Sequence, residues 1–325
     1  MSILVTGTAG FIGSVVSRIL LESGESVVGV DNLNNSYNPL IKEWRLEQLK
    51  HWPNFEFHRS DISDYQGISE LFTIYNSKNT NSFSGVINLG ARAGVLQSVE
   101  DPWTYYNTNT IGTINLLELC KKFNVPKFVL ASTSSLYGND TDQPFKEESS
   151  TNKPLSPYAA SKKAAETISY TYSYLEDIDI TVLRYFTVYG PAGRPDMVIY
   201  KFIKSIAENQ PLVIKGDGGE RDFTYVDDIA IGTIAALKPI DYEIINLGGD
   251  APIKIVNIIP IMEEKIDKRA TKSFSTRHPA DVQATWADIS KARNLLKWEP
   301  KTTIDQGIEN TVKWYLDNQE LAREI

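Results

Sequence analysis

A strand, a glycine-rich turn and a helix at the start of the chain constrain its fold most. The apolar run Ile3–Val5 predicts a strand, and three glycines follow it with the spacing G-x-x-G-x-x-G, namely Gly7, Gly10 and Gly13. Apolar residues then recur at helical spacing from Ser14 to Ser23. In this context spaced glycines indicate dinucleotide binding, because they permit a tight turn, close approach of the backbone to a pyrophosphate and close packing of helix on strand.

An acidic residue at the end of the next predicted strand strengthens this interpretation. Asp31 directly follows the strand Val27–Val30. Its carboxylate is placed to accept hydrogen bonds from an adenosine ribose and would repel a 2′-phosphate, so the pattern favours NAD over NADP. The alternative is an ordinary strand–helix–strand unit with a capping Asp, which leaves the order of glycines, helix and acid to coincidence.

Composition narrows the class of protein. The 325 residues, 42% of them hydrophobic, suffice for one large domain or two smaller ones. The net charge of −8, with Lys and Arg scattered, indicates no nucleic-acid surface. The single cysteine, Cys120, lies in an apolar helix-like run and excludes an internal disulfide. We expect no metal site and no membrane contact. Because we find neither a signal-peptide pattern nor an apolar run of bilayer length, we expect a cytoplasmic enzyme.

Strand-like runs alternate with helical patterns over more than half of the chain. The expected strands are Ile3–Val5, Val27–Val30, Phe55–His58, Gly85–Leu89, Lys127–Ala131 and Ile180–Arg184. This alternation predicts an α/β fold with a doubly wound parallel sheet covered by helices on both faces. Ligands of such sheets lie at the carboxyl ends of the strands. The residues there are Asp61 and Ile62 after the third strand, Gly90 and Ala91 after the fourth, and Ser132–Ser135 after the fifth.

A predicted helix further along carries two polar residues on one face. Ser156 and Pro157 are typical of an N-cap and a first helical position, and Tyr158 and Lys162 follow four residues apart. Taken alone, the pair indicates a surface tyrosine and a solvated lysine, and the serine run indicates a polar loop. Taken together with the glycine turn and Asp31, these residues indicate a catalytic site.

Tyr158 and Lys162 fit proton abstraction from a sugar hydroxyl. A tyrosine that acts as a base near neutral pH needs its pKa lowered by roughly three units from about 10, or ~4 kcal/mol of stabilisation. A nearby lysine ammonium and a positively charged nicotinamide ring are sources of that stabilisation. Hydride would leave the same carbon for NAD, and Thr133 or Ser134 would bridge to the hydroxyl.

These residues and further motifs resemble the extended short-chain dehydrogenase/reductases, specifically the nucleotide-sugar epimerases. The motifs extend from Ile3 to about Ala292 and comprise Gly7–Gly13, Asp31–Leu33, Ser132–Gly138, Tyr158–Lys162, Arg184–Pro191 and Arg221–Asp228. The segment Gly193–Met197 is similar to the UDP-glucuronate 4-epimerases in particular. The resemblance implies a Rossmann-type NAD-binding domain of residues 1–186 plus 225–249 and a smaller C-terminal α/β domain for the UDP-sugar, of residues 187–224 plus 250–325.

The resemblance also implies roles for individual residues. Tightly bound NAD would contact Gly7, Gly10, Phe11, Ile12, Gly13, Asp31, Asn32, Asn35, Ser36, Asp61, Ile62, Leu89, Gly90, Ala91, Asn109, Tyr158, Lys162, Tyr185 and Val188. The UDP-sugar would contact Thr133, Ser134, Ser135, Thr187, Arg194, Val213, Arg221, His278 and Asp281. Simpler roles stay open: Arg184 or Arg221 pairs with an acid inside the fold, Asp281 caps a turn, and His278 lies in a surface turn.

The serine run distinguishes related chemistries. Dehydratases of this family have an Asp-Glu pair where the chain has Ser134 and Ser135, and UDP-glucuronate decarboxylases have Glu at the position of Ser135. Oxidation of a glucuronate at C4 gives a β-keto acid that is prone to lose carbon dioxide. An epimerase must therefore hold the carboxylate in a non-reactive orientation, for which the resemblance implicates hydroxyls of Thr133, the two serines and Thr187, together with Arg194.

The sequence thus predicts an isomerase that uses NAD for C4 epimerisation of a UDP-sugar, UDP-glucuronate to UDP-galacturonate, through a transient 4-keto sugar without decarboxylation. The alternatives are a UDP-glucose/UDP-galactose or N-acetylhexosamine 4-epimerase and a UDP-glucuronate decarboxylase. The chain departs from the family pattern at Asn88, Gly90, Arg92, Leu96, Gln97 and His278.

The resemblance also implies a homodimer, in which the helices around Asn107–Lys122 and Pro157–Tyr174 of the two subunits form a bundle. The tyrosines on the second helix fit either that face or a buried face within the subunit: Tyr170, Tyr172 and Tyr174.

Overall fold

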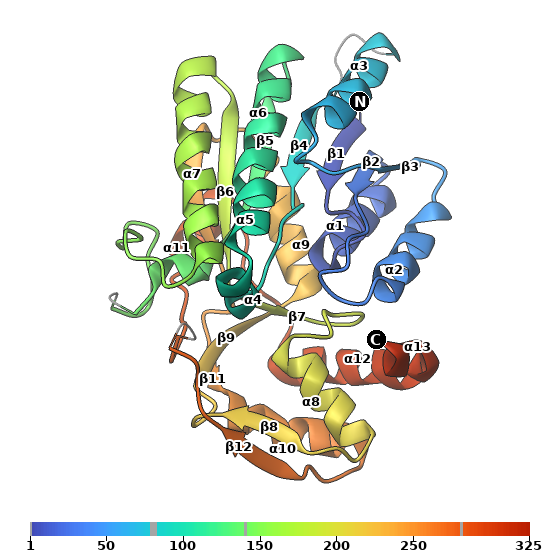
Figure 1. Cartoon of the computed structure of the whole chain (residues 1–325), viewed down its shortest axis with the longest axis vertical. Helices are drawn as coiled ribbons and strands as arrows, with labels where there is room; N and C mark the ends of the chain where they lie inside the picture. The colour runs from blue at the N-terminus through green and yellow to red at the C-terminus, as the bar shows by residue number, and fades with distance from the viewer. Residues whose placement is uncertain (1, 79–82, 140–141, 280–281) are drawn as a thin grey trace.

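A seven-stranded parallel sheet forms the centre of the molecule (Figure 1). In the computed structural model, which describes residues 2–78, 83–139, 142–279 and 282–325, the strand order is β10-β6-β5-β4-β1-β2-β3. The strands are β1 (Ser2–Thr6), β2 (Ser26–Asp31), β3 (Phe55–Arg59), β4 (Gly85–Asn88), β5 (Lys127–Thr133), β6 (Asp179–Tyr185) and β10 (Tyr242–Leu247). The predicted α/β fold with a doubly wound parallel sheet is confirmed, and β10 adds a seventh strand to the six that the sequence predicted.

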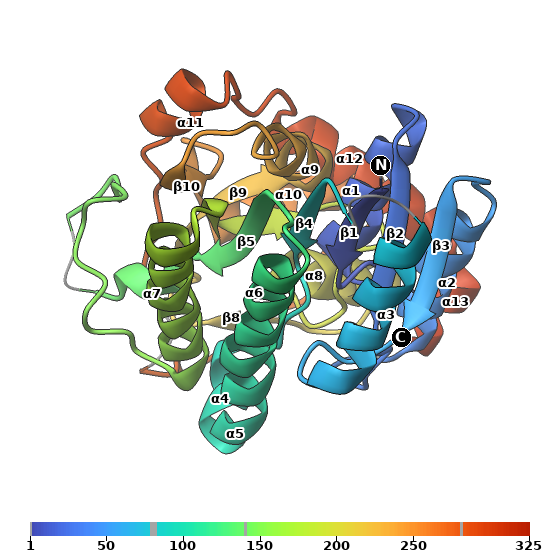
Figure 2. The ribbon, with the colours of Figure 1, turned by 90° about the horizontal axis from the view of Figure 1, so that it is seen from above.

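Helices cover both faces of this sheet (Figure 2). One face carries α1 (Phe11–Glu22), α2 (Leu40–Lys50), α9 (Val226–Ala235) and α11 (Ser290–Leu295), and the other carries α3 (Tyr65–Lys78), α6 (Gly112–Lys122) and α7 (Pro157–Glu176). Every residue of β4 and β5 is buried, because an apolar core lies on each side of the sheet. Cys120 is a free thiol within the second core.

The chain enters α6 through a series of short helices. These are α4 (Val95–Glu100), α5 (Pro102–Tyr105) and a π-helix, Tyr106–Ile111. The sequence predicts ordinary helix from about Asn107, whereas the structure widens its first turns into the π form. In that segment the Asn109 amide accepts a hydrogen bond from the backbone N–H of Arg92 at 2.8 Å and donates one to the hydroxyl of Ser161 at 2.9 Å. The π-helix therefore ties the loop after β4 to α7.

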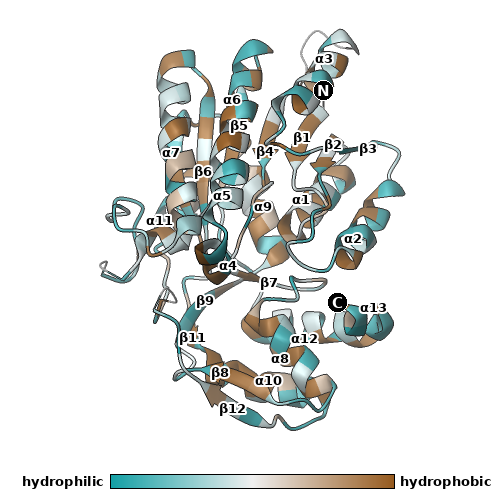
Figure 3. Cartoon of the chain, viewed as in Figure 1, coloured by the Kyte–Doolittle hydropathy of each residue, from teal (hydrophilic) through white to brown (hydrophobic). Residues whose placement is uncertain are grey.

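The second half of the chain builds a smaller lobe below the sheet in Figure 1. A three-stranded sheet comprises β7 (Thr187–Tyr189), β9 (Glu220–Tyr225) and β11 (Pro252–Lys254), and a parallel pair comprises β8 (Leu212–Lys215) and β12 (Lys272–Ser275). The helices here are α8 (Val198–Ala207), α10 (Ile255–Ile266), α12 (Ile304–Asp317) and α13 (Gln319–Glu324). A third apolar core joins them, and Figure 3 shows hydrophobic residues on the inner sides of β8, α8 and α10.

The strand order of the large sheet reverses between β1 and β4, which pair directly with each other although five other elements separate them in sequence. At such a reversal the loops diverge and leave a crevice at the carboxyl ends of the strands. The turn after β1 fits there only because its glycines lack side chains. Gly7 has a φ of +70°, and a Cβ on Gly13 would lie 2.0 Å from the carbonyl oxygen of Gly7.

Within the residues that the structure describes, no helix has both the length and the apolar character needed to cross a membrane. Over the same residues, no group of three or more His, Cys, Asp or Glu side chains is arranged to hold a metal ion.

A buried ion pair fastens the opposite end of the sheet. Lys127, the first residue of β5, donates to the carboxylate of Asp179, the first residue of β6, and to the hydroxyl of Thr181 at 2.8 Å. The same carboxylate accepts the backbone N–H groups of Ile240 at 2.7 Å and Asp241 at 2.8 Å. One acid therefore joins β5, β6 and the turn that leads into β10.

We expect Asp179→Ala to lower the free energy of unfolding by about 3–5 kcal/mol, because it leaves the Lys127 ammonium buried without its counter-charge. Urea unfolding followed by circular dichroism measures this. The matched control is Glu176→Ala, which breaks the exposed pair with Lys121 and is expected to cost less than about 1 kcal/mol. Equal losses for both variants would contradict the assignment.

Candidate active site

A cavity opens at the carboxyl ends of the central strands. Most of the residues that the sequence placed at a cofactor form its walls: Gly7, Gly10, Phe11, Ile12, Gly13, Asp31, Asn32, Ser36, Asp61, Ile62, Leu89, Gly90, Ala91, Tyr158, Lys162 and Tyr185. Arg194, which the sequence placed at the substrate, lines this cavity as well. The glycine turn, the acidic strand ends and the tyrosine–lysine helix therefore meet at one space.

The start of α1 presents backbone amides to this cavity. The N-cap, Gly10, supplies no side-chain hydrogen bond to the helix, and the first three helical residues, Phe11, Ile12 and Gly13, line the cavity wall. Uncapped amides at a helix start, reinforced by the helix dipole, favour an anionic group. This end of the cavity therefore fits the pyrophosphate of a dinucleotide.

Two carboxylates mark the far side of the glycine turn. Asp31 accepts the backbone N–H of Leu33 at 2.8 Å and that of Ala9 at 3.2 Å. Asp61 accepts the Asn32 side chain at 2.6 Å and the backbone N–H of Ser63 at 2.9 Å. Burial raises the pKa of Asp61, but hydrogen bonds from Ser63 and Asn32 outweigh burial and hold that pKa below its usual range. Both groups are therefore acceptors, as a ribose and an adenine require.

Three residues that the sequence analysis missed also form this wall: Asn34, Tyr37 and Lys42. The Lys42 ammonium donates to the backbone carbonyl of Asn34 at 2.8 Å and to its side-chain oxygen at 2.9 Å, and Arg92 donates to the same side-chain oxygen at 3.1 Å. Burial lowers the pKa of Lys42 to about 8. Asn34 lines the cavity, whereas the predicted Asn35 is exposed and outside its walls.

Tyr158 and Lys162 lie one turn apart on α7 and both face the cavity. The Lys162 ammonium donates to the carbonyl of Ala131 at 2.7 Å. Burial lowers the pKa of Lys162 to about 8, against the opposing charge of Glu166. Burial raises the pKa of Tyr158, whereas a hydrogen bond with Thr133 and the charge of Arg194 act to lower it.

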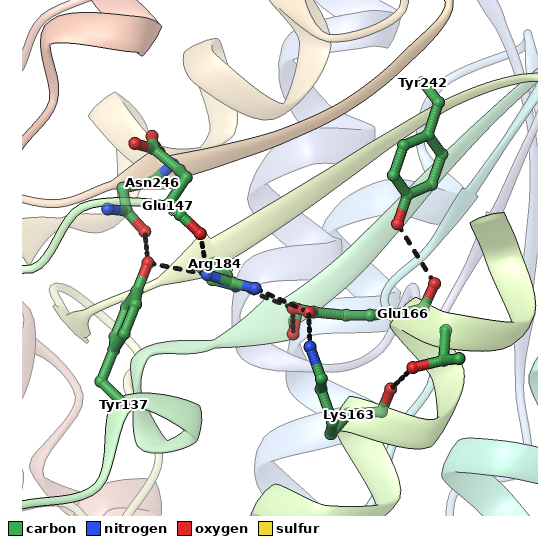
Figure 4. A network of polar contacts seen from close by, with 9 residues as sticks. Tyr137, Glu147, Lys163, Glu166, Arg184, Tyr242 and Asn246 are labelled. Carbon is green, nitrogen blue, oxygen red and sulfur yellow. Dashed lines mark hydrogen bonds and ion pairs between the residues drawn. The ribbon is translucent and has the colours of Figure 1, made fainter. Parts of the chain in front are cut away.

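A buried polar network anchors α7 behind this pair (Figure 4). Arg184 of β6 forms a two-pronged ion pair with Glu166 at 2.8 and 2.9 Å, and Ser132 donates to Glu166 at 2.6 Å. Arg184 also donates to the hydroxyl of Tyr137 at 3.0 Å, and that hydroxyl donates to the side chain of Asn246 on β10 at 2.6 Å. The simpler role considered for Arg184, pairing with an acid inside the fold, is the one that the structure shows.

Arg194 stands between the lobes. Its guanidinium forms a two-pronged pair with Asp196 at 2.6 and 3.0 Å and donates to the carbonyl of Ala93 at 3.2 Å. Its positive charge is near enough to Tyr158 to lower the pKa of that hydroxyl. An anionic group bound beside Tyr158 would therefore meet a fixed cation.

A second cavity lies in the smaller lobe between α8 and β8. It brings together three residues that the sequence placed at the substrate: Thr187, Val213 and Arg221. Arg221 donates to the backbone carbonyls of Glu220 at 2.9 Å and Val282 at 2.8 Å. The sequence analysis missed Lys201 and Lys215, which add positive charge to this wall.

Other predicted residues lie elsewhere. Val188 lines a small pocket next to Arg194, and His278 lines a separate hollow beside Phe145. Asn109 is buried and connects the loop after β4 to α7, as described above. Ser134 and Ser135 line neither the first nor the second cavity, although the hydroxyls of Ser135 and Thr133 are hydrogen-bonded at 3.2 Å. Asp281 lies outside the described residues.

Comparison with known proteins adds independent information. The family model described as GDP-mannose 4,6 dehydratase matches residues 4–311. The chain is 55% identical to the UDP-glucuronate 4-epimerase of Thermodesulfobacterium geofontis, over 99% of this chain and 98% of that protein.

Solved structures give the same result. The crystal structure of UDP-glucuronic acid 4-epimerase from Bacillus cereus, in complex with UDP-glucuronic acid and NAD, matches with a TM-score of 0.90 at 38% identity, over 98% of this chain and 99% of that one. UDP-glucose 4-epimerase of Thermotoga maritima, solved with UDP-glucose, matches with a TM-score of 0.89 at 30% identity, over 98% of this chain and 100% of that one.

The lowered pKa of Lys162 has a measurable consequence. The pKa of Lys162 is about 8 in the folded state and 10.5 in the unfolded state. Between pH 8 and pH 10.5 the unfolded chain therefore binds more protons than the folded chain, so Lys162 makes the free energy of unfolding increase with pH in this range. We expect the difference in unfolding free energy, unmodified protein minus Lys162→Met, to grow by about 3 kcal/mol from pH 8 to 10.5.

Lys121→Met is the control for this titration. Its exposed ammonium pairs with Glu176, which raises the pKa of Lys121. The difference in unfolding free energy, unmodified protein minus Lys121→Met, therefore falls as the pH rises past the ordinary pKa of a lysine. Chemical unfolding at a series of pH values, without substrate, measures both. A flat profile for Lys162→Met would contradict the assigned burial of its charge.

Proposed function

This chain belongs to the GDP-mannose 4,6 dehydratase family of extended short-chain dehydrogenase/reductases, and we propose that within it the protein is an NAD-dependent UDP-glucuronate 4-epimerase. It converts UDP-glucuronate into UDP-galacturonate and is therefore an isomerase. The observation that carries the choice of an acidic sugar is Arg194, which lines the same cavity as Tyr158 and whose charge acts to lower the pKa of that hydroxyl. The proposal agrees with the names of the relatives compared above.

The first cavity would hold NAD. The uncapped start of α1 fits its pyrophosphate, and Asp31 and Asp61 fit the ribose and the adenine. Lys162 and Tyr185 line the opposite end of the same cavity, where the nicotinamide would lie. When bound, NAD supplies reversible acceptance of a hydride from a carbinol carbon.

Tyr158 would move the proton at the sugar C4 hydroxyl. Neutral pH is below the Lys162 pKa of about 8, so the side chain is mostly protonated. Its ammonium would stabilise a phenolate on Tyr158, one helical turn away. Thr133, which is hydrogen-bonded to Tyr158, would orient the C4 oxygen, with Ser134 beside it. Because the 4-keto sugar can turn before it is reduced again, a hydride would add to the opposite face of C4 and the proton would return from Tyr158 to the C4 oxygen. The product is then the C4 epimer and no net oxidation occurs.

The second cavity would hold the nucleotide. Arg221 would bind the diphosphate by charge-assisted hydrogen bonds, and Val213 would flank the base. Thr187 lines both this cavity and the small pocket next to Arg194. Arg194 would fix the sugar carboxylate and so suppress loss of carbon dioxide from the 4-keto acid. Ser134 and Ser135 carry no ionisable side chain, so neither serves as the acid or base that dehydration or decarboxylation requires.

We also propose the two-domain division that the sequence suggested, with residues 225–249 returning to the NAD domain, and a cytoplasmic location. The protein is proposed to be a homodimer that pairs through α4, α5, α6 and α7. Exposed apolar side chains lie on α4, α5, α7 and the π-helix that leads into α6: Val99, Trp103, Tyr106, Ile111, Tyr170, Tyr174 and Leu175. Tyr172 instead packs against the core of its own subunit and donates to Glu118.

Incubation with UDP-glucuronate, followed by proton NMR of the nucleotide sugars, tests the proposed reaction. We expect UDP-galacturonate without release of carbon dioxide. Tyr158→Phe is expected to lower kcat by about 10²- to 10⁴-fold, because the proton acceptor is removed. The control on the same helix is Tyr172→Phe, with an unchanged rate. A UDP-pentose as the main product, or turnover of UDP-glucose alone, would contradict the assignment.

Multi-angle light scattering tests the homodimer. Trp103 and Tyr174 are 82% and 77% exposed, and we expect the double variant Trp103→Glu/Tyr174→Glu to elute as a monomer, because unpaired carboxylates would be buried at the interface. The matched control is Phe274→Glu in the smaller lobe, where Phe274 is 68% exposed. A monomeric unmodified protein, or dissociation by the control alone, would contradict the proposed surface.

A further inference from the structure

Arg45, on α2, is a buried cation that the mechanism above does not use. It is only 2% exposed, yet within the part of the chain that the structure describes none of its hydrogen-bond partners is a carboxylate. Instead its guanidinium donates to the carbonyl of Ala192 at 2.6 and 3.0 Å, to that of Gly193 at 3.1 Å and to that of Ala9 at 3.3 Å. It also donates to the hydroxyl of Tyr37 at 2.9 Å. One side chain thus connects three loops that lie far apart in sequence.

Each of these loops contributes to one of the two proposed ligand sites. Ala9 belongs to the glycine turn, and Tyr37 to the loop that follows Asp31 and lines the first cavity. Ala192 and Gly193 directly precede Arg194. We call the contacts of Arg45 with these four residues the Arg45 bridge. The bridge therefore spans from the loops proposed to hold NAD to the loop proposed to hold the sugar carboxylate.

The Tyr37 ring adds a second link between the same loops. The Arg45 and Arg194 guanidinium carbons each lie 5.6 Å from its centroid, and the Lys42 ammonium lies 4.9 Å from it. Cations at these distances are attracted to the ring. Arg45 thus positions Arg194 in two ways. It binds the backbone carbonyls of the two residues before Arg194, and both guanidinium groups contact the ring of Tyr37.

The backbone held by Arg45 is strained. Ala192 has a φ of +50°, in the left-handed region that disfavours residues with a Cβ. Such conformations persist where surrounding contacts enforce them and are concentrated at functional sites. The paired donors of Arg45 on the Ala192 carbonyl are the contacts that enforce it here.

We propose that Arg45 is a positioning residue for Arg194, and that the Arg45 bridge keeps the carboxylate of the 4-keto sugar from leaving as carbon dioxide. The inference rests on the proposed function of Arg194. Without the bridge, Arg194 and the carboxylate it binds have more freedom to rotate. The bond between C5 and the carboxylate then breaks, its electron pair enters the 4-keto group as an enolate, and a proton from water adds at C5. The products are carbon dioxide and a UDP-pentose or its 4-keto form.

The test is the ratio of decarboxylated to epimerised product, measured by NMR with UDP-glucuronate labelled with ¹³C at the carboxylate. For Arg45→Met we expect this ratio to rise by on the order of tenfold or more, since small displacements of a positioning group have effects of that size. Arg45→Lys is expected to fall between, because a single ammonium cannot reproduce a planar fork of donors to several carbonyls. Tyr37→Leu removes the ring and hydroxyl but keeps Arg45, and is expected to shift the ratio in the same direction.

Asp179→Ala is the matched control, because it breaks a buried ion pair at the opposite end of the sheet and destabilises the chain without touching the bridge. Its product ratio is expected to equal that of the unmodified protein. Unchanged ratios in Arg45→Lys and Tyr37→Leu would overturn the inference and leave the proposed function standing. Failure of the unmodified protein to convert UDP-glucuronate would overturn both.

Discussion

The docking of α7 against the end of β5 determines the chemistry of the whole site. Lys162 reaches the carbonyl of Ala131 across that contact and is buried there with its charge. Its nearest compensating charge is Glu166, one turn further along the helix, and Glu166 is itself fixed by Arg184 on β6. A buried charge left without its partner is strongly destabilising, so these contacts favour one orientation of α7 on the sheet. That orientation places Tyr158 in the cavity wall.

Short-range sequence patterns predicted the parts of the site that lie at strand ends and helix starts. The glycine turn, Asp31 and Asp61 each follow a strand whose apolar run is plain in the sequence, and in a parallel sheet those ends share one edge. Tyr158 and Lys162 were recognisable from their spacing after a helix-start signal. The large sheet was therefore predictable from local periodicity, and many residues that line the first cavity were predictable from their position relative to the sheet.

Long-range partners explain what the sequence did not predict. Lys42 and Arg45 lie on a polar stretch of α2 that is typical of a solvated helix, and they are buried because loops from elsewhere in the chain cover them. The sequence left open whether Arg184 pairs with an acid inside the fold, and it did not identify the partner, Glu166. Asn34 rather than Asn35 lines the cavity, a difference of one residue that depends on the exact course of a loop. No periodicity in the sequence encodes these contacts.

The late position of β10 in the chain has a consequence for biosynthesis. β6 pairs with β5 on one side and with Tyr242–Leu247 on the other, and the smaller-lobe strands β7, β8 and β9 are made between them. On the ribosome, the first six strands therefore emerge with β6 as a bare, apolar edge, and such edges recruit other chains. The nascent protein must pass through this exposed stage before β10 is translated, which makes it a natural client for chaperones during synthesis.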